Sequence, residues 1–337
     1  MPGASRTPPS PRPRSTRRAE PTMSPSAPEL IRARPVPRPG LWIWAAVVLV
    51  LVAMLVNGLV TNPNYHWDVV AEHLFDPRVL RAIGWTLILT VGAMAIGIVM
   101  AVTTAVMRMG SNPILRSVAW AYIWFFRGTP VYTQLLFWGL IAVLYPRLSL
   151  GIPFGPEFLV FDTQDVITAF VAALLGLGLN EGAYLSEIVR AGLNSVDKGQ
   201  WEAASALGMK RSTTLWRIVI PQAMRVIVPP TGNETISMLK TTSLVTAVPF
   251  SLELTFVTMA IGNRNFLPLP LLIVAAIWYL LITSILMVGQ HYLERYYGRG
   301  FDGDDQTRGS AKGMSKRQQS ILAAGTVHAD PNLEVTP

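Results

Sequence analysis

Long, mostly apolar runs separated by short polar segments limit what this chain can fold into more than any other feature. Six such runs lie at residues 41–60, 84–107, 117–146, 167–190, 223–249 and 268–291. Each has at least the roughly 20 residues that a helix needs to cross about 30 Å of hydrocarbon. Because helices satisfy their own backbone hydrogen bonds in lipid, the sequence predicts an all-α integral membrane protein with six transmembrane helices.

The composition agrees with a membrane protein and excludes several kinds of site. Of the 337 residues, 51% are hydrophobic and only 14% are charged. The net charge of +8 does not indicate a nucleic-acid partner, because the arginines gather at the N-terminus and around the ends of the apolar runs. The chain has no cysteine, which excludes disulfides, thiolate catalysis and cysteine metal sites.

Basic residues indicate the orientation of the predicted spans. They cluster at 108–116, 190–225 and 295–317, on the same side of the membrane as the basic N-terminal segment. The loops at 61–82, 147–166 and 250–267 are short, and the first two carry most of the acidic loop residues. By the positive-inside rule, both termini and the 198–222 loop are predicted to be cytoplasmic.

Composition also predicts how the chain is divided. Residues 1–40 hold eight arginines and eleven prolines and are predicted to be a disordered cytoplasmic tail. Residues 41–60 are too long for a signal-peptide core and are interpreted as an uncleaved N-terminal transmembrane helix. Residues 61–82 form an extracytoplasmic loop, residues 83–297 the main membrane domain, and residues 298–337 a second disordered tail.

A polar island between the fourth and fifth runs has the pattern of a helix, a turn and a second helix. Glu202, Ala203 and Ala204 begin it, Gly208 suits a helix end, and Ile218 and Pro221 close it. The two alanines would let another surface approach closely. The island is therefore predicted to dock on a partner, although an amphipathic loop that lies on the bilayer would have a similar composition.

The third run is interrupted by Phe126-Arg127-Gly128-Thr129-Pro130. Gly and Pro together break or kink a helix, and freed backbone groups are tolerated at membrane depth only against protein or water. An arginine at the centre of a span costs at least about 2.5 to 3.5 kcal/mol, so Arg127 should be paired or should reach the interface.

Polar stripes on the fourth and fifth runs indicate a water-accessible pathway for a solute. Candidate pathway residues, besides Arg127, are Glu181, Tyr184, Glu187, Asn233, Glu234, Lys240 and Thr241. Arg127 or Lys240 could meet a carboxylate, and Glu181 or Glu234 an ammonium group. Two structural alternatives stay open: an ion pair of Glu187 with Arg190, and pairing of Lys240 with Glu181.

Four segments, in this order, resemble the permease subunits of bacterial binding-protein-dependent ABC importers of the polar amino-acid uptake family. They are the RGTP segment at 127–130, GAYLSEIVRAG at 182–192, the EAA loop at 202–221, and PPTGNETISMLKTTSLV at 229–245. Ser186 replaces a common alanine, and Thr241 stands where aspartate is usual. The likeness covers about residues 84 to 297, and the first run and both tails lie outside it.

The resemblance implies a five-helix permease core, a second permease copy or paralogue, two ATPase subunits and an extracytoplasmic solute-binding protein. It implies a multi-pass protein of the bacterial inner or plasma membrane. Coupling to the ATPase would run through Glu202, Ala203, Ala204, Gly208, Ile218 and Pro221. The chain has no GxxxxGK[ST] phosphate loop, so ATP and Mg²⁺ are expected on the partner ATPase and no cofactor on this chain.

Three other functions remain as alternatives: a passive channel, a membrane-embedded enzyme, and a permease for another small polar solute. Neither HExxH nor GxSxG occurs, and the four histidines, His66, His73, His291 and His328, are scattered. No catalytic or metal site is therefore predicted. A passive channel gives no reason for the 202–221 pattern. The substrate and the choice between homodimer and heterodimer are left open.

Overall fold

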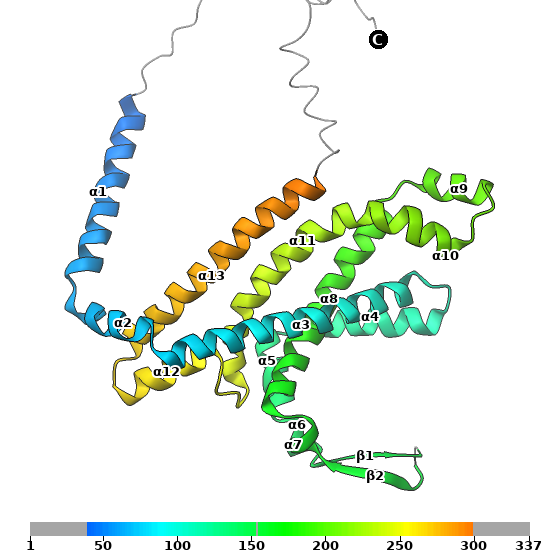
Figure 1. The fold of residues 1–337 in the computed structure, drawn as a ribbon, viewed down its shortest axis with the longest axis horizontal. Coiled ribbons are helices and arrows are strands. Elements are labelled where there is room, and N and C mark those ends of the chain that lie inside the picture. The colour runs from blue at the N-terminus through cyan, green and yellow to red at the C-terminus, as the bar shows by residue number, and fades with distance from the viewer. Residues whose placement is uncertain (1–38, 153, 299–337) are drawn as a thin grey trace, which may run out of the picture. The chain divides into compact units, whose positions relative to one another are not determined.

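The computed structural model describes residues 39–152 and 154–298, which are mostly helical (Figure 1). Contacts divide the chain after Asn62 into two units. The first unit holds the helix α1 (Pro39–Thr61), whose side chains from Trp42 to Val60 are all exposed. Apart from residues 39, 40 and 298, the two predicted tails lie outside the described residues.

Four of the described helices are long and apolar enough to cross a membrane. They are α1, α3 (Pro77–Met109), α8 (Ala169–Asn194) and α13 (Pro268–Tyr297), and they contain the first, second, fourth and sixth predicted runs. The length and composition of these four helices are those of an integral membrane protein. α3 begins earlier than the predicted run because Pro77 starts it and the Asp76 carboxylate accepts a hydrogen bond from the Arg78 amide at 2.7 Å.

The third run is broken at the Gly128–Pro130 segment that was predicted to interrupt it, and the fifth run is not one long apolar helix. The third run falls in three short helices, α4 (Pro113–Gly128), α5 (Val131–Gly139) and α6 (Ile141–Leu144), because Gly128 and Pro130 end the first of them. The fifth run forms α11 (Ile220–Thr241) and then a 3₁₀ turn, η3 (Thr242–Ala247). Arg225, Glu234 and Lys240 make α11 too polar to qualify by composition.

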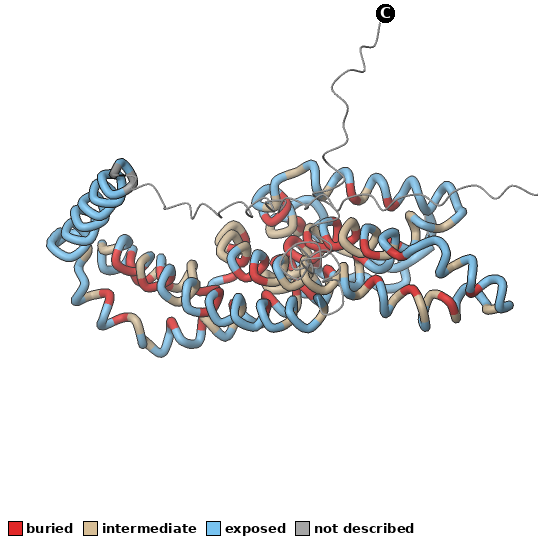
Figure 2. Tube along the Cα trace, turned by 90° about the horizontal axis from the view of Figure 1, so that it is seen from above, coloured by how far each residue is buried: buried red, intermediate tan, exposed pale blue. Residues whose placement is uncertain are grey.

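Small residues bring α3 and α8 into close contact in the second unit. A Cβ on Gly178 would lie 2.7 Å from the Ile96 side chain, and one on Gly182 would lie 2.6 Å from Met100 and 2.7 Å from the Tyr122 hydroxyl. Tyr122 also donates a 2.6 Å hydrogen bond to the Leu179 carbonyl. In lipid, small residues permit helix packing where no hydrophobic force between helices operates. The buried residues Leu89, Ala93, Met94, Ala101, Leu177 and Leu185 of these two helices belong to one core cluster, and Figure 2 shows many buried residues gathered in the middle of the packed helices.

A second buried cluster joins α2 (Trp67–Leu74), α3, α12 (Leu254–Arg264) and α13. Glu253 caps α12: its carboxylate accepts bonds from the amides of Thr255 at 2.7 Å and Phe256 at 3.3 Å. The Thr86 and Tyr279 hydroxyls satisfy its other oxygen. The segment 61–82, predicted as an external loop, contains η1 (Pro63–Tyr65), the helix α2 and the start of α3.

A β-hairpin corrects the prediction that the fold is purely α-helical. Its strands β1 (Arg147–Gly151) and β2 (Glu157–Asp162) pair antiparallel, and the short helix α7 (Thr163–Val166) leads on to α8. Cross-strand pairs place Leu148, Leu150, Leu159 and Phe161 on one face. Arg147 pairs with Asp162 on the other face, so the segment has the alternation of a strand.

We predict that Gly182→Ala lowers the thermal stability of the folded chain, because its methyl group would meet Met100 and Tyr122 in the contact between α3 and α8. Overpacking of this kind costs about 1–3 kcal/mol. The matched control is Gly84→Ala, also within a helix, where an added Cβ meets nothing within 4 Å and the better helix propensity of alanine should show. Thermal unfolding in detergent measures both, and equal melting temperatures would contradict the packing role.

Candidate functional site

The break between α4 and α5 is held by two side-chain amides. Gln134 Nε2 donates to the Phe126 carbonyl at 3.0 Å, to the Thr129 carbonyl at 3.1 Å and to the Thr129 hydroxyl at 2.7 Å. Asn180 Nδ2, from α8, donates to the same Phe126 carbonyl at 2.9 Å and to Gln134 Oε1 at 3.1 Å. The carbonyls freed by the break therefore have partners inside the protein, as membrane depth requires.

A cavity of about 460 Å³ opens beside this break, between the α4–α5 junction, α8 and α11. Five predicted pathway residues line it together: Arg127, Glu181, Tyr184, Glu234 and Thr241. Asn180 and Ser237 add further polar groups to its wall. The structure thus brings residues from three separate motifs to one place.

The charged groups of this cavity differ in their partners. The Arg127 guanidinium carbon lies 5.1 Å from the centre of the Tyr184 ring, which is within the range of a cation–π contact. Glu181 is only 5% exposed, and its Oε1 is buried without a hydrogen-bond partner among the described residues. Glu234 lines the same cavity and is half-buried. One guanidinium therefore shares the space with two carboxylates.

Two predicted pathway residues lie elsewhere, on the neighbouring face of α11. Asn233 and Lys240 line a separate cavity of about 350 Å³ between α11 and α13. Gln290, His291 and Glu294 form its α13 wall. No ion pair joins Lys240 to Glu181 in the described part of the chain.

Glu187 lies in an ion-pair network instead of either cavity. It pairs with Arg108 of α3, and its other oxygen accepts bonds from Arg190 at 2.6 and 2.9 Å. The local Glu187–Arg190 pair was one of the open alternatives, and the structure contains it. Both oxygens of this carboxylate bond to guanidinium groups, so Glu187 serves to join α3 to α8.

Like Asn180 and Ser237, Gln134 belongs to this site but was not among the predicted site residues. It is 5% exposed and, from α5, bonds to Phe126 and Thr129 at the end of α4. It follows Pro130 by one helical turn, at the end of the segment that resembles the RGTP motif.

The 198–222 loop contains the predicted helix and turn. α9 (Lys198–Ala206) carries Glu202 and Ala203 on its exposed side, and Ala204 is buried. Gly208 ends the turn with φ at +72°, the left-handed region that favours glycine. The helix end is closed by hydrogen bonds from the Gly208 amide to Ser205 at 2.9 Å and from the Met209 amide to Ala204 at 3.0 Å.

The prediction that Pro221 ends the second helix is wrong. α10 (Arg211–Thr214) passes into a π-helical turn, η2 (Leu215–Val219), which contains half-buried Ile218 and leads directly into α11. Pro221, the second residue of α11, follows this π-helical turn directly, and the backbone is helical on both sides of it. The loop and the fifth run are therefore one continuous helical path.

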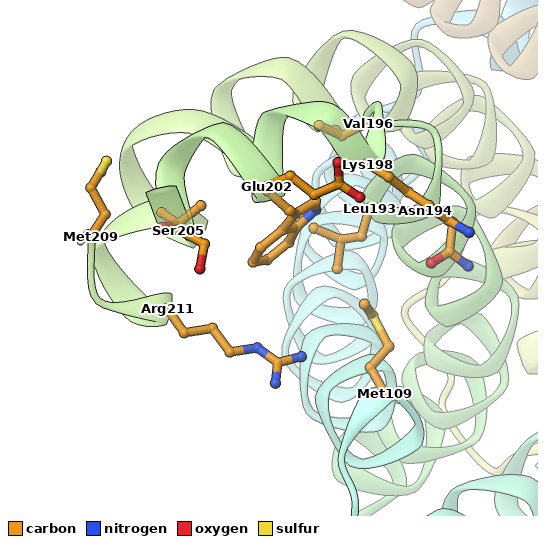
Figure 3. A pocket seen from close by; sticks show the side chains of 11 residues that line it. Met109, Leu193, Asn194, Val196, Lys198, Glu202, Ser205, Met209 and Arg211 are labelled. Atoms are coloured by element: carbon orange, nitrogen blue, oxygen red, sulfur yellow. The ribbon is translucent and has the colours of Figure 1, made fainter. Parts of the chain in front are cut away.

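A pocket of about 590 Å³ lies under this loop, between α9, α10 and the ends of α3 and α8 (Figure 3). Figure 3 shows Glu202 and Arg211 on its loop side and Met109 on the α3 side. Next to it, Leu207 and Trp216 are 81% and 70% exposed. The loop therefore presents large apolar side chains that no described part of the chain covers.

Comparison with known proteins decides the family. Residues 93–298 match the family described as binding-protein-dependent transport system inner membrane component. The chain belongs to this family. The motif-based recognition is confirmed, and the chain is a permease that works with a solute-binding protein and an ATPase, as such components do.

Two relatives of the permease are named as transport proteins for arginine and L-cystine. The arginine transport system permease protein ArgU of Corynebacterium glutamicum is 46% identical over 94% of this chain and 96% of its own length. The L-cystine transport system permease protein TcyB of Bacillus subtilis is 36% identical over 69% of this chain and 92% of its own length. The crystal structure of an amino acid ABC transporter with histidines matches with a TM-score of 0.55 and 34% identity. The match covers 66% of this chain and 95% of that chain.

We predict that Gln134→Leu and Asn180→Leu each destabilise the permease by about 1–3 kcal/mol, because each leaves buried polar groups unpaired. The two side chains bond to each other and share the Phe126 carbonyl, so the double variant should cost less than the sum of the two single variants. Thermal unfolding of the four proteins in detergent measures the coupling. Strictly additive losses would show that the two amides act independently.

Proposed function

We propose that the permease forms half of the pathway of an ATP-driven importer and that its substrate is a basic amino acid. The observation that carries this proposal is the charge of the α4–α8–α11 cavity, where two carboxylates face one guanidinium. A substrate with one carboxylate and two cations complements that set. Arg127 would receive the α-carboxylate, and Glu181 and Glu234 the two cationic groups.

The unpaired oxygen of Glu181 supports a ligand in this cavity. Burial of a carboxylate without a hydrogen-bond partner is costly, and a cationic substrate would supply the missing donor. The relative named as an arginine transport permease, which matches nearly the whole chain, supports the same class of substrate. Lys240 lines the α11–α13 cavity and not this one, so Arg127 is the cation proposed to bind the substrate carboxylate.

The proposed topology keeps six crossings in the bacterial inner or plasma membrane, with both termini cytoplasmic. α1, α3, α8 and α13 supply four of them, and the α4–α5 pair and α11 with η3 supply two more. The broken pair and polar α11 line the cavity, which is where irregular and polar segments are tolerated in a membrane. The basic residues around 198–217 support the cytoplasmic side for the α9–α10 loop.

The proposed transporter also needs ATPases, a second permease and a solute-binding protein. The sequence contains no phosphate-binding loop, so two partner ATPases would hold ATP and Mg²⁺ and supply the energy. A second permease copy or a paralogue would complete the pathway, and the solute-binding protein would deliver the amino acid. The α9 helix, with Glu202 and Ala203, would dock on the ATPase together with the exposed Leu207 that follows it.

We predict that Glu181→Gln lowers arginine uptake, because a neutral amide loses a charged contact worth about 1.5–3 kcal/mol, or roughly ten-fold or more in kcat/KM. Uptake is measured in proteoliposomes that contain the permease with its ATPase and binding protein. The control is Glu294→Gln, which removes a carboxylate from the other cavity. Unchanged arginine kinetics in Glu181→Gln would contradict the assigned substrate contact.

We predict that Gly208→Pro abolishes both uptake and substrate-stimulated ATP hydrolysis while membrane insertion is kept. Proline fixes φ near −65°, whereas Gly208 has φ at +72°, so the turn after α9 cannot form. Lys210→Pro is the matched control, because Lys210 already has φ at −64°. Uptake and ATPase assays of the assembled transporter compare them. A fully active Gly208→Pro transporter would exclude a coupling role for this turn.

A further inference from the structure

A basic pocket lies apart from the substrate cavity, at the ends of α3 and α8 and the start of α4. It has a volume of about 570 Å³ and contains three arginines, Arg108, Arg116 and Arg190. Ser117, Trp120 and Asn194 add hydrogen-bonding groups, and Met109 completes the lining. None of the functions described above uses this pocket.

The pocket has an excess of positive charge. Glu187 is the carboxylate that pairs with Arg108 and Arg190, and it is shared between them. Arg116 Nη2 donates to the Gly110 carbonyl at 3.1 Å and has no carboxylate partner among the described residues. Three guanidinium groups against one carboxylate leave two positive charges to be balanced by an anion.

Among anions, phosphate fits the hydrogen-bonding geometry of the three arginines. A guanidinium group presents a planar fork of donors that matches phosphate oxygens, and it stays charged at any physiological pH. The Ser117 hydroxyl and the Asn194 amide are further donors in the same lining. Arg116 is exposed and tied to the chain by a single described bond, so its other donors are free to turn to a ligand.

The surroundings of the pocket indicate a lipid. α3, a candidate membrane span, ends at Met109 within the lining, so the pocket lies where a span leaves the hydrocarbon. Trp120 of the lining and Trp124, one turn farther along α4, are 58% and 65% exposed and stack with ring centres 6.0 Å apart. Exposed tryptophans next to basic residues are typical of the interface between headgroups and acyl chains.

We propose that this pocket binds the phosphate headgroup of an anionic phospholipid. The three arginines would hold the phosphate, and the Trp120–Trp124 stack would pack against the glycerol and the upper acyl chain. The bound lipid would compensate the charge at the joint where Glu187 links α3 to α8. The proposal rests on the membrane topology proposed above and not on the identity of the transported substrate.

Native mass spectrometry of the full-length chain with its ATPase partner, titrated with phosphatidylglycerol in detergent, tests the site directly. We expect saturable binding that phosphatidylcholine does not match. Arg116→Gln should weaken it about ten-fold, the factor that corresponds to loss of one charged hydrogen bond of about 1.4 kcal/mol. The control Arg295→Gln removes the same charge from an exposed position in the last turn of α13, outside the pocket.

The other outcomes separate the alternatives. Equal weakening by Arg116→Gln and Arg295→Gln would reduce the effect to general surface charge and overturn the site. Displacement of the lipid by millimolar inorganic phosphate, with no effect of Trp120→Ala, would assign the pocket to a soluble phosphate. Equal binding of phosphatidylcholine would overturn the proposal. Lipid binding is measured without transport, so a failed uptake assay does not affect this test. A failed lipid-binding test likewise leaves the proposed substrate unaffected.

Discussion

The paired amides of Gln134 and Asn180 are the interaction on which the site depends. A helix that stops at Gly128 inside a membrane segment exposes carbonyls that lipid cannot satisfy. Gln134 and Asn180 donate to those carbonyls, so the break is stable and a cavity can open beside it. Without them, the break that Gly128 and Pro130 impose would leave the Phe126 and Thr129 carbonyls without these donors.

The two carboxylates of α8 show how one helix serves two purposes. Glu187 bonds to guanidinium groups from two sides, so it joins α3 to α8 and has little capacity for a ligand. Glu181, less than two turns away, is buried with an oxygen that has no described partner. A protein gains nothing in stability from such an oxygen, which is why Glu181 is the stronger candidate for contact with a transported cation.

Much of this arrangement could be predicted from the sequence, because apolar length fixes α3, α8 and α13 and because Gly208 and Pro130 act locally. The cavity that Lys240 lines could not be predicted from the sequence. Glu234 and Thr241 share one face of α11, whereas Asn233 and Lys240 are rotated by about 100° onto the next face. A helical wheel shows both faces but not which helix packs beside each. The β-hairpin was missed for a different reason, since long apolar runs dominate the pattern and hide a short alternation such as Leu148–Ser149–Leu150.

The unbroken path from the α9–α10 loop into α11 would supply a physical route for the proposed coupling to an ATPase. The backbone stays helical from Arg211 to Thr241, and this stretch includes Glu234 and Thr241 of the cavity wall. A helix resists compression along its axis, so a displacement of the loop by an ATPase would be passed along the backbone to these side chains. The π turn at Leu215–Val219 and the prolines Pro229 and Pro230 are the places where such an element can bend. Gln290 of α13 donates to the Pro229 carbonyl at 2.7 Å, which ties that bend to the last helix and gives the movement a fixed point.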